Sequence, residues 1–591
     1  MQNPLFDDRF VDFLLDVVHP VGETLALPAF AEHDRETCAL YLDGARRFAR
    51  EVLWPSYRPM DAEPPVFEGG RVRLHPLMKR LYPRICGLGV MTASRDVAVG
   101  GHRLPRQVAM MASSYLMAGN LSAVGLALLT AGAGHLVEVF GDETVRGLFL
   151  GPMYDGRWTG TMALTEPQAG SSLADLSTAA TPRADGTFAI RGSKIFISGA
   201  DHDVAENVVH LTLARIDGAP AGSGGISLFA VPRLRPEAGG LVDNDVTVTQ
   251  LIHKIGWRGL PSLGIAFGER GECRGWLVGA PGNGLGAMFQ MMNEARIAVG
   301  AQGVATASAA YHAAVAYARE RAQGRPLGAR GGGQVAIIEH PDVRRMLLRQ
   351  RAIVEGGLAL VSYAARCADR AHDDPDPAAR EHNARLLDVL TPIVKSFPAE
   401  YGFEACALAV QVHGGYGYTT EYLPEALLRD QKLNSIHEGT TGIQGLDLLG
   451  RKGVREGGAA LRALIGEVEA AVAAAKSTDL DPAWGAVMAA NDRRIAAVTM
   501  ALAAKGAAGE VEAMLAHSHA YLTALSIHVV AWQWLLVATA CARAASPGPF
   551  HHARRRAAQA WFAVEVPRVA ALLDLCASGD DSHLACDPAW F

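Results

Sequence analysis

The chain has 591 residues, more than a single hydrophobic core usually serves, so about three to five compact units are expected. Hydrophobic residues make up 49% and charged residues 20%, a balance that excludes an intrinsically disordered chain. The net charge of −6 excludes an overall basic field for holding nucleic acid or anionic lipid.

The hydrophobic periodicity changes several times along the chain and predicts five stretches. These are an N-terminal extension (1–34), an N-terminal helical domain (35–156), a middle β domain (157–280), a helical bundle (281–452) and a C-terminal helical extension (455–591). In the β domain, the Asp185-Gly186 pair predicts a hairpin turn before a strand. A four-helix bundle is the natural form of the fourth stretch, although Pro392 and Pro398 argue against a continuous helix over residues 384–412.

The cysteines and the first twenty residues indicate in which cellular compartment the protein is expected. The eight cysteines have irregular spacings and form no CxxC pair, which predicts reduced, mostly buried thiols and no metal site or disulfide scaffold. Acidic residues interrupt the first twenty positions, so no signal peptide is expected and the protein is expected to be cytoplasmic. Residues 513–542 lack Asp, Glu, Lys and Arg, but their histidines and hydroxyl side chains favour buried helices or a subunit interface over a transmembrane segment.

Two segments in or near the β domain carry residues suited to binding a flat polar ring. MALTEPQAGSSLADL (162–176) offers hydroxyls and a flexible glycine, which suit a cofactor loop as well as an ordinary turn. In GSKIFISGA (192–200), Phe196 and Ser198 are two apart and would share one face of a strand. They could cover and hydrogen-bond a cofactor, or form a plain cross-strand core pair.

Two further segments lie in the helical bundle. QVHGGYGYTTEYLPEALLRD (411–430) lets backbone approach a ligand at Gly414-Gly415, but it lacks a nucleotide-binding motif and also fits a helix C-cap. In SIHEGTTGIQGLDLLG (435–450), Glu438 precedes an apolar helix that Thr440 or Thr441 can cap. Taken alone, Glu438 fits a solvated carboxylate at a helix start.

The order and domain context of the four segments resemble the acyl-CoA dehydrogenases. LTEPQAGS is similar to the family's TEPxAGSD loop, with Ser172 at the usual Asp, and KIFISG is similar to its KxWITNG strand. QVHGGYGY, LLRD and IHEGTTGIQ match its QxxGGxGY, RD and YEGT series with the same spacing. The resemblance is to a long subgroup that includes 3-(methylthio)propionyl-CoA and broad-range fatty-acyl-CoA dehydrogenases. It implies an α+β fold: an N-terminal helical domain, a middle β-barrel-like domain, a C-terminal four-helix bundle and an extra C-terminal helical domain.

The resemblance implies a role for each matching residue. Glu438 would be the catalytic base, with Glu294 as its rival on a facing helix. The flavin ring would meet Met162, Leu164, Thr165, Phe196 and Ser198. The rest of FAD would meet Arg321, Gln323, Gln411, Gly414, Gly415 and Thr440, with Arg321 and Gln323 acting across a subunit interface despite an insertion in RAQGRPLG. The acyl-CoA substrate would meet Ser171, Asn293, Arg296 and Gly439.

The implied activity is FAD-dependent α,β-dehydrogenation of an acyl-CoA thioester to the trans-2-enoyl-CoA. Electrons would pass to an electron-transfer flavoprotein, and the protein would be a homodimer. The substrate would be a fatty acyl-CoA or 3-(methylthio)propionyl-CoA. Two alternatives are an acyl-CoA oxidase and a non-catalytic, DNA-associated flavoprotein of the same fold, for which the only support is HHARRR (551–556).

Overall fold

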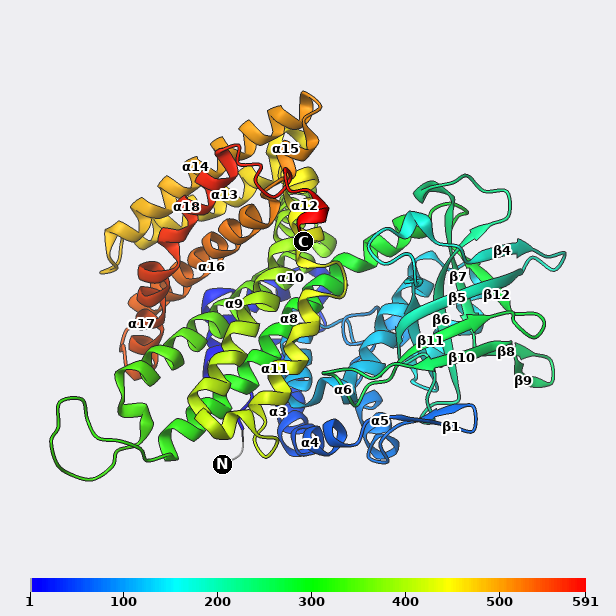
Figure 1. The fold of residues 1–591 in the computed structure, drawn as a ribbon, viewed down its shortest axis with the longest axis horizontal. Coiled ribbons are helices and arrows are strands. Elements are labelled where there is room, and N and C mark those ends of the chain that lie inside the picture. The colour runs from blue at the N-terminus through cyan, green and yellow to red at the C-terminus, as the bar shows by residue number, and fades with distance from the viewer. Residues whose placement is uncertain (1–2) are drawn as a thin grey trace. The chain divides into compact units, whose positions relative to one another are not determined.

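The computed structural model describes residues 3–591, without the side chains of residues 289–294. The chain folds into two compact units (Figure 1). The bundle unit comprises Met1–Leu40, Pro105–Ser114 and Arg296–Phe591, and the sheet unit comprises Tyr41–Leu104 and Tyr115–Ala295. The fold class expected from the sequence, helical, then β, then helical, is confirmed.

Helices and a small hairpin precede the main sheet in the chain. The helices are α3 (Arg35–Phe48), α4 (Trp54–Ala62), α5 (Met78–Cys86), α6 (Arg106–Phe140) and α7 (Glu143–Tyr154). The hairpin joins β1 (Val66–Glu68) to β2 (Arg71–Arg73). The sequence predicted helices alone here, and the prediction missed this hairpin. Its signal is the pair Gly69-Gly70, because both residues have positive φ, the requirement of a two-residue turn between twisted strands.

An eight-stranded sheet forms the centre of the sheet unit, in the order β10-β11-β5-β12-β7-β6-β3, with β4 pairing with β5 and β6. Its strands are β3 (Trp158–Ala163), β4 (Ala179–Pro182), β5 (Phe188–Ser198), β6 (Asn207–Ile216), β7 (Ile226–Pro232), β10 (Val246–Leu251), β11 (Ser262–Phe267) and β12 (Arg274–Val278). The predicted hairpin turn is confirmed, since β4 and β5 pair antiparallel on either side of Asp185-Gly186.

Close packing joins the sheet to two helices. Gly160 of β3 has no room for a side chain, because a Cβ atom there would lie 2.5 Å from the Cβ of Ala133 on α6 and 2.6 Å from the Cε of Met153 on α7. Apolar side chains of α6, α7, β3, β6 and β7 form one buried cluster around this contact. The glycine therefore fixes the strand that leads to the TEPQAGS loop against two helices.

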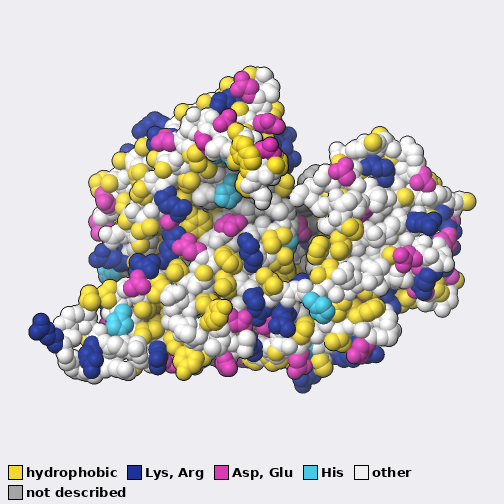
Figure 2. Space-filling model, in the orientation of Figure 1, with side chains coloured by type: hydrophobic (Ala, Val, Ile, Leu, Met, Phe, Trp, Pro, Cys, Tyr) yellow, Lys and Arg dark blue, Asp and Glu magenta, His cyan; other side chains and the backbone are white. Residues whose placement is uncertain are grey.

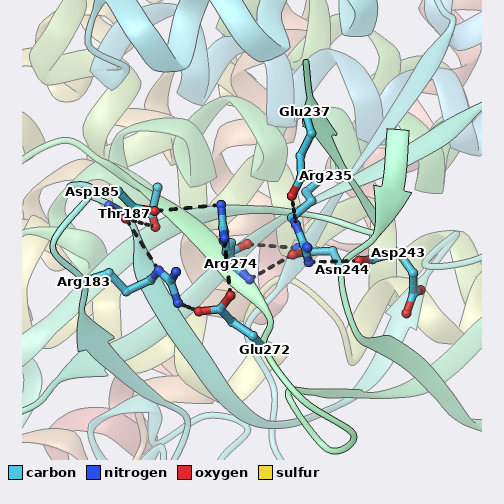
Figure 3. A network of polar contacts seen from close by, with 9 residues as sticks. All are labelled: Arg183, Asp185, Thr187, Arg235, Glu237, Asp243, Asn244, Glu272 and Arg274. Atoms are coloured by element: carbon cyan, nitrogen blue, oxygen red, sulfur yellow. Dashed lines mark hydrogen bonds and ion pairs between the residues drawn. The ribbon is translucent and has the colours of Figure 1, made fainter. Parts of the chain in front are cut away.

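A polar network ties a second hairpin to the sheet (Figure 3). The hairpin consists of β8 (Leu234–Glu237) and β9 (Gly240–Asp243). Asn244, which follows it, is fully buried, accepts from the backbone N–H of Arg274 and donates to its carbonyl, each at 2.9 Å. Arg274 and Glu272 form an ion pair at 3.4 Å. Because Asn244 satisfies both backbone groups of a residue on β12, it replaces a missing strand pairing.

Long helices build the bundle unit. They are α8 (Gly284–Glu320), α9 (Pro341–Asp373), α10 (Pro377–His413) and α11 (Pro424–Lys432). Helices α8 and α10 run parallel, because Gly300 lies against Val394, Gly303 against Pro398, and Tyr317 against His413. A Cβ atom on Gly300 would lie 2.3 Å from the carbonyl oxygen of Val394, so this glycine permits the close contact between the helices.

The prediction that prolines interrupt the third bundle helix is wrong, since α10 runs unbroken through Pro392 and Pro398. Proline removes the hydrogen bond to the carbonyl four residues earlier. For Pro392 that carbonyl belongs to Asp388, and the ammonium group of Lys452 donates to it at 3.1 Å. A buried partner from outside the helix therefore replaces the bond that the proline lacks, which sequence periodicity cannot show.

Helices of the C-terminal extension pack on the bundle within the same unit (Figure 1). They are α13 (Arg455–Ala475), α14 (Pro482–Ala507), α15 (Val511–Leu515), α16 (Ser518–Ala542), α17 (Pro549–Val564) and α18 (Val566–Ala577). Trp534 of α16 donates its indole N–H to the carbonyl of Ala352 on α9 at 3.0 Å. A Cβ atom on Gly356 would lie 2.6 Å from that indole nitrogen, so the contact requires glycine.

The long apolar helices and the cysteines, which the sequence analysis singled out, are mostly buried. Helices over Arg106–Phe140 and Val511–Ala542 are long and apolar enough to cross a membrane, but 89% of the apolar window in the second is buried within the protein. This agrees with the expectation of buried helices over residues 513–542. All eight cysteines are free, and all but Cys86 and Cys586 are buried.

The start of the chain is anchored to the bundle unit. It carries α1 (Asp8–Phe13) and α2 (Val21–Leu25). The amide of Asn3 donates to the carbonyl of Ala309 on α8 at 2.9 Å, and Ser308 donates to the carbonyl of Leu5 at 2.6 Å. The N-terminal segment is thus held by polar groups of a bundle helix.

Candidate active site

The TEPQAGS loop at the end of β3 is held in place by a buried carboxylate. Glu166 receives six hydrogen bonds, three on each oxygen. Four come from the backbone and hydroxyl groups of Ser177 and Thr178, one from Gln168 and one from Lys194 at 2.8 Å. Lys194 also donates to the carbonyl of Leu164 at 3.0 Å. These bonds hold the loop in one conformation.

The charges of this pair stabilise each other in the interior. Burial acts to raise the pKa of Glu166, but the ammonium group of Lys194 and the donors around the carboxylate lower that pKa to about 2. Burial lowers the pKa of Lys194, and Glu166 opposes that shift. Sequence reasoning missed both residues, although Glu166 lies inside the TEPQAGS motif and Lys194 inside the KIFISG strand.

The predicted flavin-contacting residues of the sheet unit lie on two connected segments. Met162, Leu164 and Thr165 are half-buried at the end of β3, and the carbonyl of Thr165 accepts from the backbone N–H of Ile195 on β5 at 2.9 Å. Phe196, the next residue, is 61% exposed. An exposed aromatic ring therefore stands beside the half-buried loop. Ser198 is half-buried further along β5, and Ser171 is exposed on the loop.

Phe196 lies on a bulge, which the sequence did not predict. The register between β5 and β11 shifts there, so two residues of β5 stand opposite Gly264. Phe196 has a φ of 61°, which is rare for an aromatic residue. The regular alternation used to place Phe196 and Ser198 on one face is thus interrupted between Lys194 and Ile197.

Glu438 lies on a short loop before α12 (Thr441–Asp447) in the bundle unit. Its φ of 55° is left-handed, and Gly439 after it has a φ of 84°. The side-chain amide of Gln444 donates to the carbonyls of both residues at 3.3 Å. Thr440 caps the helix by accepting from the backbone N–H of Ile443, as predicted. The carboxyl group is thus carried by a strained turn that the following helix holds.

Opposing electrostatic effects act on Glu438. Burial raises the pKa of its carboxyl group, while the charges of Arg296 and Lys395 act to lower it. Arg296 is only 4% exposed and pairs with Asp447 of α12 at 3.2 Å. A Cβ atom on Gly439 would lie 3.7 Å from a guanidinium nitrogen of Arg296, so the structure brings three predicted residues together. Sequence reasoning missed Lys395 and Asp447; a lone lysine in the apolar run TPIVKSFP was the available signal.

The remaining predicted FAD residues lie at the far ends of α8 and α10. Tyr317 of α8 stacks on His413 of α10 with ring centroids 4.4 Å apart, which places the two helix ends side by side. Five predicted residues are exposed there: Arg321, Gln323, Gln411, Gly414 and Gly415. Gly414 and Gly415 have open space around the position of a Cβ atom. These residues form a second cluster, which we call the helix-end cluster.

The insertion in RAQGRPLG forms an exposed loop beside this cluster. Its base is closed by hydrogen bonds from the N–H of Gln323 to the carbonyl of Val335 at 2.9 Å and from the N–H of Val335 to the carbonyl of Gly324 at 3.1 Å. Leu327 on the loop is 88% exposed, and basic side chains mark the loop at the left edge of Figure 2. The insertion therefore leaves Gln323 at the closed base of the loop.

Two predicted side chains, Asn293 and Glu294, lie outside the described residues. The basic run HHARRR, which supported the DNA-associated alternative, lies on α17 and is not a free basic face. Arg554 is buried and paired with Asp7 and with Glu355, the latter at 2.9 Å. Arg555 pairs with Asp479 at 2.9 Å.

Known families match three consecutive parts of the chain. "Acyl-CoA dehydrogenase, middle domain" matches residues 161–269, and "Acyl-CoA dehydrogenase, C-terminal domain" matches residues 282–452. "Acetyl-CoA dehydrogenase C-terminal like" matches residues 464–587. The first two matches contain the TEPQAGS loop and Glu438, respectively, and the third covers most of the C-terminal extension.

Individual relatives agree with these matches. The chain is 40% identical to 3-methylmercaptopropionyl-CoA dehydrogenase of Ruegeria pomeroyi over 77% of this chain and 77% of that protein. It is 34% identical to a broad-specificity linear acyl-CoA dehydrogenase of Mycobacterium tuberculosis over 77% and 76%. It is 33% identical to a butyryl-CoA dehydrogenase of Syntrophomonas wolfei over 86% and 84%. The chain therefore belongs to the acyl-CoA dehydrogenase family and is an enzyme of that class.

Solved structures show the same fold at lower identity. ACDH-11 of Caenorhabditis elegans, solved in complex with C11-CoA, has a TM-score of 0.76 at 18% identity, covering 99% of this chain and 96% of that one. An acyl-CoA dehydrogenase of Bacillus anthracis, complexed with FAD, has a TM-score of 0.75 at 18% identity, covering 97% and 93%. Both likenesses extend through the C-terminal extension.

Proposed function

We propose that the protein oxidises an acyl-CoA thioester to the trans-2-enoyl-CoA with bound FAD, using Glu438 as the base. The observation that carries the proposal is the environment of Glu438 in a chain of this family. It is a carboxyl group whose pKa burial raises, held on a strained turn beside the guanidinium group of Arg296. A carboxylate with a raised pKa is a stronger base than a solvated one, which abstraction of a weakly acidic α proton requires.

Different groups of the protein have different roles in the proposed reaction. Glu438 takes the α proton onto its carboxylate, and the electron pair left behind forms the new double bond as the β hydrogen departs with its own pair. Bound FAD supplies the acceptor for that hydride. The backbone N–H of Glu438 donates to the thioester carbonyl, where negative charge develops, and such a donor contributes about 3–4 kcal/mol to the rate. Burial raises the pKa of Glu438, and the positive charges of Arg296 and Lys395 oppose that shift by favouring the carboxylate form.

Residues of the sheet unit fit the ring of FAD. Phe196 presents an exposed aromatic ring on the bulge of β5, and the hydrogen bond between Ile195 and Thr165 holds that bulge beside the TEPQAGS loop. The backbone and hydroxyl of Thr165 supply polar groups next to an apolar face, as a flat, polar-edged ring requires. Within this loop Glu166 accepts from Lys194 of β5, which also donates to the carbonyl of Leu164, and these bonds hold the loop in place.

The helix-end cluster supports a homodimer. Arg321 directly follows the end of α8, 25 residues after Arg296, which corresponds to about 37 Å at 1.5 Å per residue. One FAD molecule held near Glu438 cannot span that separation within a subunit. We therefore assign Arg321, Gln323 and Gly414–Gly415 to the FAD of a second copy of the chain, so that two copies complete each other's sites.

Anaerobic reduction of the flavin tests the proposal. Purified protein is mixed without oxygen with butyryl-CoA, octanoyl-CoA or 3-(methylthio)propionyl-CoA, the thioester classes that the relatives' names indicate. Wild type is expected to lose its flavin absorbance near 450 nm, and Glu438→Gln to retain it while binding FAD and substrate normally. The fastest of the three thioesters identifies the substrate class. A wild-type flavin that none of them bleaches would overturn the proposal.

The electron acceptor is a separate part of the proposal. We propose an electron-transfer flavoprotein, as expected for a dehydrogenase. Turnover with that protein as acceptor, together with negligible oxygen uptake, is the expected result. Rapid oxygen consumption with release of hydrogen peroxide would instead make the enzyme an acyl-CoA oxidase.

A further inference from the structure

A lysine in the middle of α10 is fully buried. Lys395 has no exposed surface, and its ammonium nitrogen has no hydrogen-bond partner among the residues that the structure describes. An uncompensated buried ammonium group destabilises the folded state, so a chain that keeps one is expected to gain something else from it. The other buried lysines of the bundle and sheet units differ, since Lys452 pairs with Asp388 at 3.0 Å and Lys194 with Glu166 at 2.8 Å.

Helix packing directs this lysine towards the loop of Glu438. Helix α10 packs against α12 and against the short helical turn Leu433–Ser435, the two elements that flank the loop. Glu400, five residues after Lys395, accepts from the hydroxyl of Thr441 at the first position of α12. Val394, the residue before Lys395, lies against Gly300, about one helical turn after Arg296. Lys395 and Arg296 therefore approach the same loop from two parallel helices.

The charged groups around Lys395 come from each of these elements. Glu438 and Glu400 favour its ammonium form, while burial and the positive charge of Arg296 oppose it, and together they lower its pKa to about 8. The charge of Lys395 in turn acts to lower the pKa of Glu438, and together with burial it lowers the pKa of the neighbouring His437. The carboxylate of Asp447 is shared between Arg296 at 3.2 Å and Arg451 at 2.6 Å. Arg296 and Lys395 are the two positive groups that act on Glu438.

We propose that Lys395 is a positioning residue for the base: its buried ammonium group holds Glu438 as a carboxylate and keeps the loop over residues 436–440 set for abstraction of the α proton. This inference rests on the proposed dehydrogenation. Lys395 transfers no proton to substrate; the α proton passes to Glu438 alone. An ammonium group that makes no hydrogen bond to the described side chains suits this role, because it stabilises the negative charge without occupying the oxygens that must face the substrate.

The test compares the pH dependence of flavin reduction in wild type, Lys395→Met and Lys395→Arg. Removing a positive charge close to a carboxylate raises the pKa of that carboxylate, typically by about one to three units. The acid limb of the limiting reduction rate should therefore move to higher pH in Lys395→Met by about that amount, a loss of about tenfold or more at the acid end of the profile. Lys395→Arg should restore much of the wild-type profile. Above about pH 8, where Lys395 itself loses its charge, the profiles of wild type and Lys395→Met should converge.

Controls separate a charge effect from a folding defect. Lys432→Met removes a positive charge from an exposed position on α11 and should leave the profile unchanged. FAD content and the substrate dissociation constant are measured for every variant, and the effect is expected in the limiting rate, not in substrate binding. Where Lys395→Met does not retain FAD, Lys395→Gln takes its place, since its amide keeps a hydrogen-bonding group in the same space without the charge.

The outcomes distinguish the two proposals. Wild-type bleaching in the same series tests the dehydrogenation itself, so its absence overturns the proposed function. With bleaching present, an acid limb at the same pH in wild type and in the neutral variant overturns the role of Lys395. An equal loss of rate at every pH also overturns it, because a merely structural role would produce that result.

Discussion

The network behind the TEPQAGS loop predicts that Glu166→Gln strongly destabilises the sheet unit. Each oxygen of Glu166 accepts three hydrogen bonds. An amino group in place of one oxygen donates and cannot accept, so three donors would lose their acceptor. The hydroxyls of Ser177 and Thr178 can rotate and accept, but a backbone N–H cannot. One unsatisfied buried donor costs about 1–3 kcal/mol, and leaving Lys194 unpaired costs more, so a loss of about 3–5 kcal/mol is expected.

The pH dependence gives a second estimate of that magnitude. The native pKa of Glu166 is about 2, against 4.5 for an unperturbed group, and the difference corresponds to about 3 kcal/mol. Because the folded-state pKa is depressed, this stability is fully present above about pH 4.5 and is lost as the pH falls towards 2. The difference between wild type and Glu166→Gln should therefore be constant near neutral pH and shrink in acid.

Urea unfolding, followed by tryptophan fluorescence at several pH values, provides the measurement. Glu237→Gln is the matched control, since that carboxylate pairs with Arg235 at 2.7 Å on an exposed hairpin of the same unit and its loss should leave the stability nearly unchanged. Lys194→Met should cost about as much as Glu166→Gln, and the double variant less than the sum. A Glu166→Gln protein within about 1 kcal/mol of wild type at neutral pH would refute the reasoning.

Three further substitutions test close contacts. Gly445→Val should lower both the thermal midpoint and the rate of flavin reduction, because even a Cβ atom there would lie 2.8 Å from the carbonyl oxygen of Ser518; an unchanged midpoint would show that α12 does not need α16. Gly356→Ala should cost about 1–3 kcal/mol in urea unfolding, since its Cβ atom would lie 2.6 Å from the indole nitrogen of Trp534, and equal stability would contradict the packing. Asn244→Ala should cost about 2–4 kcal/mol by leaving two buried backbone groups unpaired, with proteolysis near residue 240 as a second readout.

Much of the fold follows from periodicity, and the exceptions have local causes. The change from a 3.6-residue to a two-residue period correctly located the sheet because burial determines both patterns. The continuity of helix α10 escaped prediction because the partner for the carbonyl left free by Pro392 is Lys452, sixty residues later. The first hairpin was missed because its strands are only three residues long, too short for any alternation to show.

The candidate site was predictable where a motif specified it and not where packing did. The segment IHEGTTGIQ predicted the cap at Thr440, which the structure confirms, and its resemblance to the family made Glu438 the predicted base. It did not identify Lys395, which reaches the same loop from a separate helix. Arg296 was expected to lie along the CoA arm, and the structure gives it a buried partner in Asp447. Such pairings depend on which helices are neighbours, which one sequence does not state.

Backbone strain recurs in both parts of the predicted site. Glu438 and Phe196 both adopt positive φ, at 55° and 61°, a conformation that costs a residue with a side chain about 1 kcal/mol or more. Each strained residue is held by hydrogen bonds to its neighbours: Gln444 donates to the carbonyl of Glu438, and the N–H of Ile195 donates to the carbonyl of Thr165 beside Phe196. Neither conformation is needed to build a loop or a strand. A left-handed residue projects its side chain away from the direction that regular backbone would give, which under the proposed function would present the base and an aromatic ring to bound molecules.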